Sequence, residues 1–149
     1  SCPFEDDHAR VIAETPVELS VTDVEGHDAL GKLLILAAVV MDAPLRADQV
    51  RRRGITGLTP GDIQRAQARG QRWKLIAHLR RTSTGVEAGV EPQMVDAGHP
   101  LAAVSGATNA ITYVTDLMGE VTLVGAGAGR RETGFALLSD LLEIQRLRR

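Results

Sequence analysis

Residues 23–41 read Asp23-Val-Glu-Gly-His-Asp28-Ala-Leu-Gly-Lys32-Leu-Leu-Ile-Leu-Ala-Ala-Val-Val-Met41. The nine residues after Lys32 are apolar without a break, which predicts a helix that is buried on all sides. A run of nine residues is too short to cross a bilayer, so the interior of a protein is the expected place for it. Thr22 or Asp23 is the expected N-cap, and Asp42-Ala-Pro44 ends the helix.

Asp28 and Lys32 stand four residues apart at the start of this helix and therefore share one face. Positions one turn further along that face, Ile35, Leu36 and Val39, are apolar. The charged pair is therefore expected to point toward the buried side of the helix or toward a cleft that opens onto it. Spacing alone leaves two interpretations open. One is an ordinary ion pair worth about 0.3–0.5 kcal/mol; the other is a proton donor, Lys32, that Asp28 holds and tunes.

The composition excludes several classes of protein. A chain of 149 residues with 44% apolar and 24% charged residues can form one domain with a core of its own. A net charge of −2 gives no reason to expect nucleic acid or an anionic membrane as a partner. The single cysteine, Cys2, cannot form an internal disulfide, which fits a reducing cytoplasm, and no segment resembles a signal peptide or a membrane span.

Lys32 and Lys74 are the two lysines among 17 basic residues, and the others are arginines. Codon bias in a GC-rich genome explains such a ratio without any reference to function. Where arginine is the usual cation, however, a lysine on a largely apolar helix suggests a need that only lysine meets. Its compact ammonium can give up a proton, whereas a guanidinium practically cannot.

The rest of the chain predicts short helices and two hairpins. Thr59 followed by Pro60 predicts the start of a second helix, which Gly70 closes, with Ile63, Ala66 and Gln67 on its inner side. We further expect a short helix at 7–14, strands at 72–80, 85–95, 110–115 and 120–124, and an amphipathic helix at 133–147. The predicted fold class is α+β, with a mainly antiparallel sheet and helices packed on one face.

Two further groups of residues are candidates for a site. The acids Glu18, Asp23, Glu25 and Asp28 crowd into eleven residues; the crowding is typical of a helix N-terminus, and it would also suit a substrate ammonium. Gly125-Ala-Gly127-Ala128-Gly129 follows a strand and precedes a helix, but Arg130 replaces the third glycine of a dinucleotide fingerprint. This segment is therefore expected beside a cofactor that is held mainly elsewhere. The four histidines show no metal-ligand spacing, so no metal is expected.

Five motifs, taken in their order along the chain, resemble the catalytic segment of homoserine dehydrogenases. The resemblance is carried by Asp23-Val-x-Gly26-x-Asp28-Ala-x-x-Lys32-Leu-x-Ile-Leu, Gly54-Ile55 with Asp62, Ala66 and Gly70, Lys74-Leu75-Ile76-Ala77, Pro100-Leu101-Ala102-x-Val104-x-Gly106-x-x-Asn109-Ala110 with Thr115-Asp116, and Gly125-x-Gly127-Ala128-Gly129 with Thr133. It covers about residues 16–145. Taken singly, only the Asp-x-x-x-x-Asp-x-x-x-Lys segment is specific.

The resemblance implies the reduction of aspartate semialdehyde to homoserine with NADP or NAD as cofactor, on the route to threonine and methionine. It makes Lys32 the proton donor to the aldehyde oxygen and Asp28 the residue that orients Lys32 and the substrate. Asp23 and Glu18 match acids of the substrate site. Gly125, Gly127, Ala128 and Gly129 match the segment that passes close to the nicotinamide.

The resemblance also implies a division of the chain. Residues 1–15 match nothing in the family and stay unassigned, whereas 16–149 would be a catalytic and dimerisation domain that forms a homodimer. The main cofactor site would lie in an N-terminal nucleotide-binding domain that these residues do not contain, so this chain alone is expected to be inactive. The alternative is a stand-alone dimeric module that binds an amino acid and does no redox chemistry.

Overall fold

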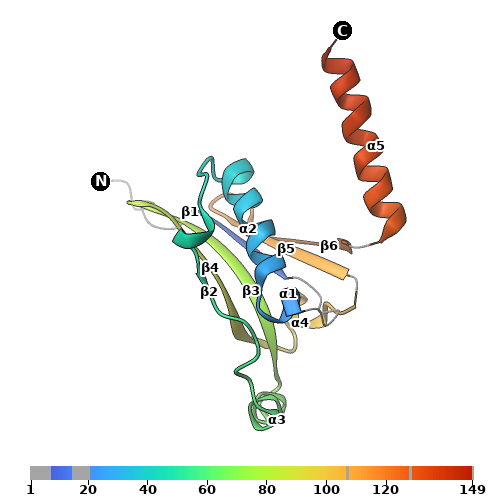
Figure 1. The fold of residues 1–149 in the computed structure, drawn as a ribbon. Coiled ribbons are helices and arrows are strands. Elements are labelled where there is room, and N and C mark those ends of the chain that lie inside the picture. Colours follow the sequence, from blue (N-terminus) through green and yellow to red (C-terminus); the bar gives the residue numbers. More distant parts are fainter. Residues whose placement is uncertain (1–7, 15–20, 107, 128, 149) are drawn as a thin grey trace.

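One six-stranded sheet forms the centre of the computed structural model, which describes residues 8–14, 21–106, 108–127 and 129–148 (Figure 1). The strand order is β2-β4-β3-β1-β5-β6, and all neighbours are antiparallel except β2 and β4. The strands are β1 (His8–Glu14), β2 (Arg51–Arg52), β3 (Gln71–Thr82), β4 (Gly85–Asp96), β5 (Thr108–Thr115) and β6 (Gly119–Ala126). The predicted α+β class with a mainly antiparallel sheet is confirmed, and both predicted hairpins, β3–β4 and β5–β6, are present.

Strand β1 joins the two hairpins into one sheet. It pairs with β3 on one side, where Ala13 faces Ala77, and with β5 on the other, where Ala13 faces Ile111. The prediction of a helix at 7–14 is therefore wrong, since residues 8–14 form a strand. A segment of seven residues with two β-branched residues in succession, Val11 and Ile12, can form either a helix or a strand. Here it forms a strand, because the edges of β3 and β5 on either side of it both need a hydrogen-bonding partner.

The predicted helix from residue 22 to 41 is divided into α1 (Val21–Val24) and α2 (His27–Val40). Gly26 separates them with a φ of 77°, a left-handed conformation that glycine adopts at little cost. It is also the N-cap of α2, so the N-cap that we expected at Thr22 or Asp23 is wrong.

Helix α2 lies along one face of the sheet and is buried on one side only (Figure 1). Leu33 and Ala37 pack into a core that Leu75, Leu79 and Val90 form with them and their neighbours. On the opposite side Ile35 is 64% exposed and Val39 77% exposed, so the predicted burial on all sides is wrong for the single chain. The helix therefore presents an apolar face that the sheet does not cover.

The remaining helices are α3 (Pro60–Ala68), α4 (Pro100–Ala103) and α5 (Arg130–Leu147). Thr59 caps α3 as predicted, and its hydrogen bonds lower the pKa of the Asp62 carboxyl group, but on the predicted inner side only Ala66 is buried. The short α4 packs Leu101 against Ile76, on the face of the sheet opposite α2.

The last helix, α5, runs away from the sheet, and all of its residues are exposed (Figure 1). Several large apolar side chains of α5 lie in solvent, among them Phe135, Leu138 and Leu141. In the part of the chain that the structure describes, no helix combines the length and the apolar character needed to cross a bilayer.

The connection between α1 and α2 is held from outside by residues 52–55. The Arg52 guanidinium donates to the carbonyl of Glu25, and the backbone N–H of Ile55 donates to the carbonyl of Val24 at 2.9 Å. Gly54 lies so close that a Cβ atom there would overlap the Val24 carbonyl oxygen and lie 2.7 Å from the Cα of Glu25. Both neighbours are backbone atoms, which cannot rotate out of the way.

Replacing Gly54 by alanine is therefore expected to lower the free energy of unfolding by about 1–3 kcal/mol, the usual effect of overpacking a tight contact. Gly57→Ala is the matched control, because a Cβ at Gly57 meets no atom within 4 Å. That variant should stay within about 0.5 kcal/mol of the parent protein. Urea unfolding measures both, and equal stabilities of the two variants would contradict the predicted close contact.

Candidate active site

Asp28 and Lys32 form the ion pair that their spacing predicts. Both come from the first turns of α2, and Lys32 Nζ lies 2.9 Å from Asp28 Oδ2. Their side chains are 41% and 42% exposed, so the pair lies at the surface of the helix and its Coulomb energy is largely screened by water. The attraction alone therefore contributes little to stability.

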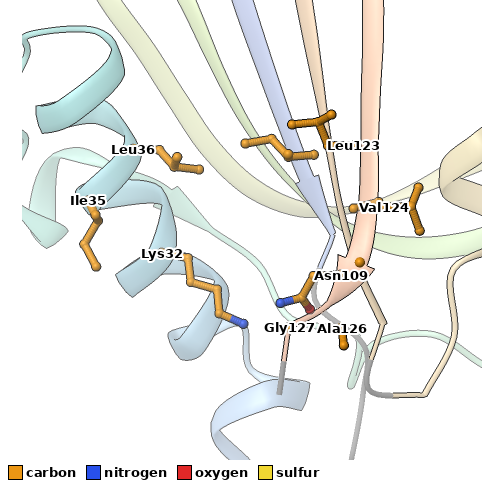
Figure 2. Close-up of a pocket in the computed structure, with 11 residues that line it drawn as sticks. Lys32, Ile35, Leu36, Asn109, Leu123, Val124, Ala126 and Gly127 are labelled. Carbon is orange, nitrogen blue, oxygen red and sulfur yellow. The ribbon is translucent and has the colours of Figure 1, made fainter. Parts of the chain in front are cut away.

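Lys32 borders a cavity of about 470 Å³ between α2 and the adjoining ends of β5 and β6 (Figure 2). The sequence allowed a buried side or a cleft for the charged pair. The structure shows Lys32 at the border of a cleft, whereas Asp28 is not among the residues that line it. Apolar side chains and glycines form most of the wall, and Lys32 and Asn109 are its polar side chains. The lining residues are Lys32, Ile35, Leu36, Asn109, Ala110, Ile111, Leu123, Val124, Gly125, Ala126 and Gly127.

Figure 2 shows the Lys32 ammonium extending across this cavity toward Asn109 and the end of β6. A molecule bound in the cavity would replace part of the water around the ammonium, and the charge would then act more strongly on that molecule than it does in water. The cavity also has a volume within the range of small-molecule sites. The arrangement can therefore supply a proton or a positive charge to an oxygen atom of a bound molecule.

Asn109 and Gly127 are in close contact at the floor of the cavity. A Cβ atom at Gly127 would overlap the amide group of Asn109, so this position requires glycine. The Asn109 Oδ1 atom is buried, and none of the described residues donates a hydrogen bond to it. Asn109 was not among the predicted site residues. It lies in a segment quoted for the resemblance, but nothing in the sequence indicated that its amide faces Lys32.

The other predicted site residues are distributed as follows. Gly125 and Gly127 line the cavity with Lys32, whereas Gly129 is the N-cap of α5 and is not among the lining residues. Asp23 lies in α1, one turn before α2, and also does not line the cavity. Glu18 and Ala128 lie outside the described residues. Within the described ranges, no group of three or more His, Cys, Asp or Glu residues could hold a metal ion.

A second cavity, of about 820 Å³, lies between α3, β3 and residues 104–106. Lys74 is one of its lining residues, and its ammonium donates to the carbonyl of Val104. None of the predicted site residues lines this cavity. Volume alone therefore does not identify the site, and the cavity that contains Lys32 is the better candidate.

Comparison with known proteins shows which family this sequence resembles. The profile described as homoserine dehydrogenase matches residues 12–142. An NAD(+)-dependent homoserine dehydrogenase of Pseudomonas canavaninivorans is 47% identical over 123 residues, which are 82% of this chain and 35% of that protein. The homoserine dehydrogenase of Pseudomonas aeruginosa is 38% identical over 124 residues, 83% of this chain and 29% of that protein. The chain thus spans about a third of the length of these relatives.

Solved structures agree with this result. Homoserine dehydrogenase of S. aureus superposes with a TM-score of 0.84 at 30% identity, over 95% of this chain and 44% of that one. The enzyme of Thiobacillus denitrificans gives 0.84 at 27% identity, over 95% of this chain and 40% of that one. A hyperthermophilic archaeal homoserine dehydrogenase, solved as a mutant with NADPH, shares the fold with a TM-score of 0.68 at 24% identity, over 93% of this chain and 47% of that one.

Proposed function

Because this chain belongs to the homoserine dehydrogenase family, we propose that it is the catalytic part of an oxidoreductase that interconverts aspartate semialdehyde and homoserine with NAD(P)H. The observation that carries the proposal is the Lys32 ammonium, which borders the cavity that Gly125 and Gly127 help to form. The matched region is about a third of the relatives' length, so the complete reaction needs further residues.

A bound nicotinamide supplies the hydride for this reaction. The role of this chain is to neutralise the negative charge that develops on the carbonyl oxygen as the aldehyde is reduced. Lys32 donates the proton to that oxygen, and in the reverse direction accepts it. Asp28, at 2.9 Å, keeps the ammonium directed toward the cavity and balances its charge.

The acids near the start of α2 suit the other end of the substrate. Aspartate semialdehyde and homoserine carry an ammonium group, which is costly to remove from water unless a carboxylate pairs with it. We propose Asp23 and Glu18 for this role. The position of Asp23 one turn before α2 supports this role for Asp23, whereas the same role for Glu18 is proposed from the resemblance alone.

The cofactor is a nicotinamide dinucleotide, held mainly by residues outside this chain. The relative of this chain from Pseudomonas canavaninivorans is named as NAD(+)-dependent, and the structure of the archaeal homoserine dehydrogenase was solved with NADPH. Both names support a nicotinamide cofactor, and the choice between NAD and NADP rests with the part that binds the ribose. The segment of Gly125, Gly127, Ala128 and Gly129 would lie beside the nicotinamide.

We also propose that residues 16–149 form a homodimer and that the enzyme serves threonine and methionine biosynthesis. The uncovered apolar face of α2, with Ile35 and Val39, supports a partner surface, as does β6 at the edge of the sheet. The unassigned segment 1–15 would then contribute at least β1 to the same unit, since β1 pairs with both hairpins.

The decisive experiment expresses the complete reading frame of the gene and follows NADPH or NADH oxidation with aspartate semialdehyde. We expect turnover by the complete protein and little by residues 1–149 alone, because the matched region covers only about a third of the length of the relatives. Calorimetry with homoserine provides the control. If the complete protein bound homoserine but neither bound nor oxidised a dinucleotide, the non-redox binding module would replace the present proposal.

A further inference from the structure

The amide group of Asn109 has a hydrogen-bonding capacity that the described part of the chain does not use. Its Oδ1 atom is buried and receives no donor from any described residue. A buried acceptor left without a donor costs about 1–3 kcal/mol, so native proteins rarely keep one without a reason. The Asn109 side chain also lines the cavity that contains Lys32, so a molecule bound in the proposed active site would lie next to this amide.

The surroundings of Asn109 indicate the kind of group that would use it. Ile35, Leu36, Ile111 and Leu123 form apolar walls, which suit a flat ring and do not suit a second charged group. Gly127 packs directly against the amide, which occupies the space that a Cβ at position 127 would need. The ligand group should therefore be uncharged, attached to a flat ring, and able to donate to an amide oxygen.

A primary carboxamide on an aromatic ring meets all three conditions. It offers an N–H to the Asn109 oxygen and a carbonyl oxygen to the Asn109 N–H group, so both halves of the side-chain amide are satisfied at once. A carboxylate has no N–H to offer. An ammonium has no acceptor and would have to be buried against the apolar walls.

We propose that the side-chain amide of Asn109 binds the carboxamide group of the nicotinamide ring. Asn109 is then the residue of this chain that fixes which way the ring faces Lys32, although the rest of the dinucleotide is held elsewhere. The inference rests on the proposed function, since it needs a nicotinamide cofactor. The glycine at position 127 is part of the same arrangement, because a Cβ there would displace the amide.

The test measures binding of NAD and of its acetylpyridine analogue, in which a methyl ketone replaces the carboxamide and removes the N–H donor. Isothermal titration calorimetry on the protein expressed from its complete reading frame gives both dissociation constants. The parent protein should bind the analogue about three- to tenfold more weakly than NAD, the usual effect of losing one hydrogen bond. In Asn109→Ala, the affinity for NAD should fall by a similar factor, and NAD and the analogue should then bind equally well.

Asn109→Asp is the matched variant, because it keeps the shape and the acceptor oxygen but loses the N–H donor. It should keep the preference for NAD over the analogue. A preference that is lost in Asn109→Ala and kept in Asn109→Asp is a pattern that a purely structural role of Asn109 would not produce. Thermal unfolding of both variants reports whether they fold. If a folded Asn109→Ala kept the parent's preference for NAD, Asn109 would not bind the carboxamide, and the proposed function would stand. If the parent protein bound neither dinucleotide, both proposals would fall.

Discussion

Replacing Lys32 by alanine is expected to lower the turnover number of the complete enzyme by about a hundred- to ten-thousandfold, the range for removing a general acid. The fold should survive the change. The Lys32 side chain is 41% exposed, and its ion pair with Asp28 is of a kind worth about 0.3–0.5 kcal/mol. Steady-state oxidation of the reduced cofactor measures the effect, and thermal unfolding of the same sample shows that the protein is intact.

Lys32→Arg separates the two roles of the ammonium. Arginine keeps the positive charge and can still pair with Asp28, but a guanidinium gives up a proton too reluctantly to serve as a general acid. We therefore expect Lys32→Arg to remain within about tenfold of Lys32→Ala in turnover. Full activity of Lys32→Arg would show that charge, and not proton transfer, is what Lys32 provides. Full activity of Lys32→Ala would reduce the pair to a simple surface ion pair.

Replacing Leu33 by alanine is expected to lower the free energy of unfolding by about 2.5–5 kcal/mol, the range for creating a cavity in a well-packed core. Leu33 is 1% exposed and lies between α2 and the sheet, next to Ala37 and Leu79. A loss of this size is a large fraction of the stability of a typical domain. Urea unfolding followed by circular dichroism measures it.

Val39→Ala is the control on the other side of the same helix. Val39 is 77% exposed, so in the single chain its truncation should change the free energy of unfolding by no more than about 0.5 kcal/mol. In a homodimer that covers this face, the effect should be larger and should grow with protein concentration. Equal and small effects at Leu33 and Val39 would contradict the one-sided packing of α2.

The sequence predicted the central part of the site because helical spacing is regular. Residues four apart share a face of a helix, so Asp28 and Lys32 had to be neighbours, and the structure shows them 2.9 Å apart. A glycine-rich segment between a strand and a helix was equally visible, and Gly125 and Gly127 indeed line the cavity with Lys32. Their catalytic and cofactor roles stay predictions.

Asn109 could not be predicted in the same way, because its position in the site depends on contacts between distant segments. It faces Lys32 only because β5 and α2 come together at one end of the sheet, and sequence spacing carries no information on that approach. The burial of α2 was overestimated for a related reason. An unbroken apolar run shows that a helix is covered, but not whether its own chain or another chain covers it.

The fold was predicted where local signals are strong. Turn residues between alternating segments indicated both hairpins, and Thr59 with Pro60 marked the start of α3. Strand β1 was missed because seven residues carry too little periodicity to separate a helix from a strand. Its identity is decided by β3 and β5, whose first residues follow it by dozens of positions.

The central place of β1 has a consequence for synthesis on the ribosome. β1 emerges before either of its neighbours, so it has no strand partner until β3 and then β5 have been translated. Each hairpin can close by itself within microseconds, whereas the insertion of β1 between them requires long loops to close first. In the interval two strand edges are open to other nascent chains, and this early strand is where a chaperone would protect the protein most effectively.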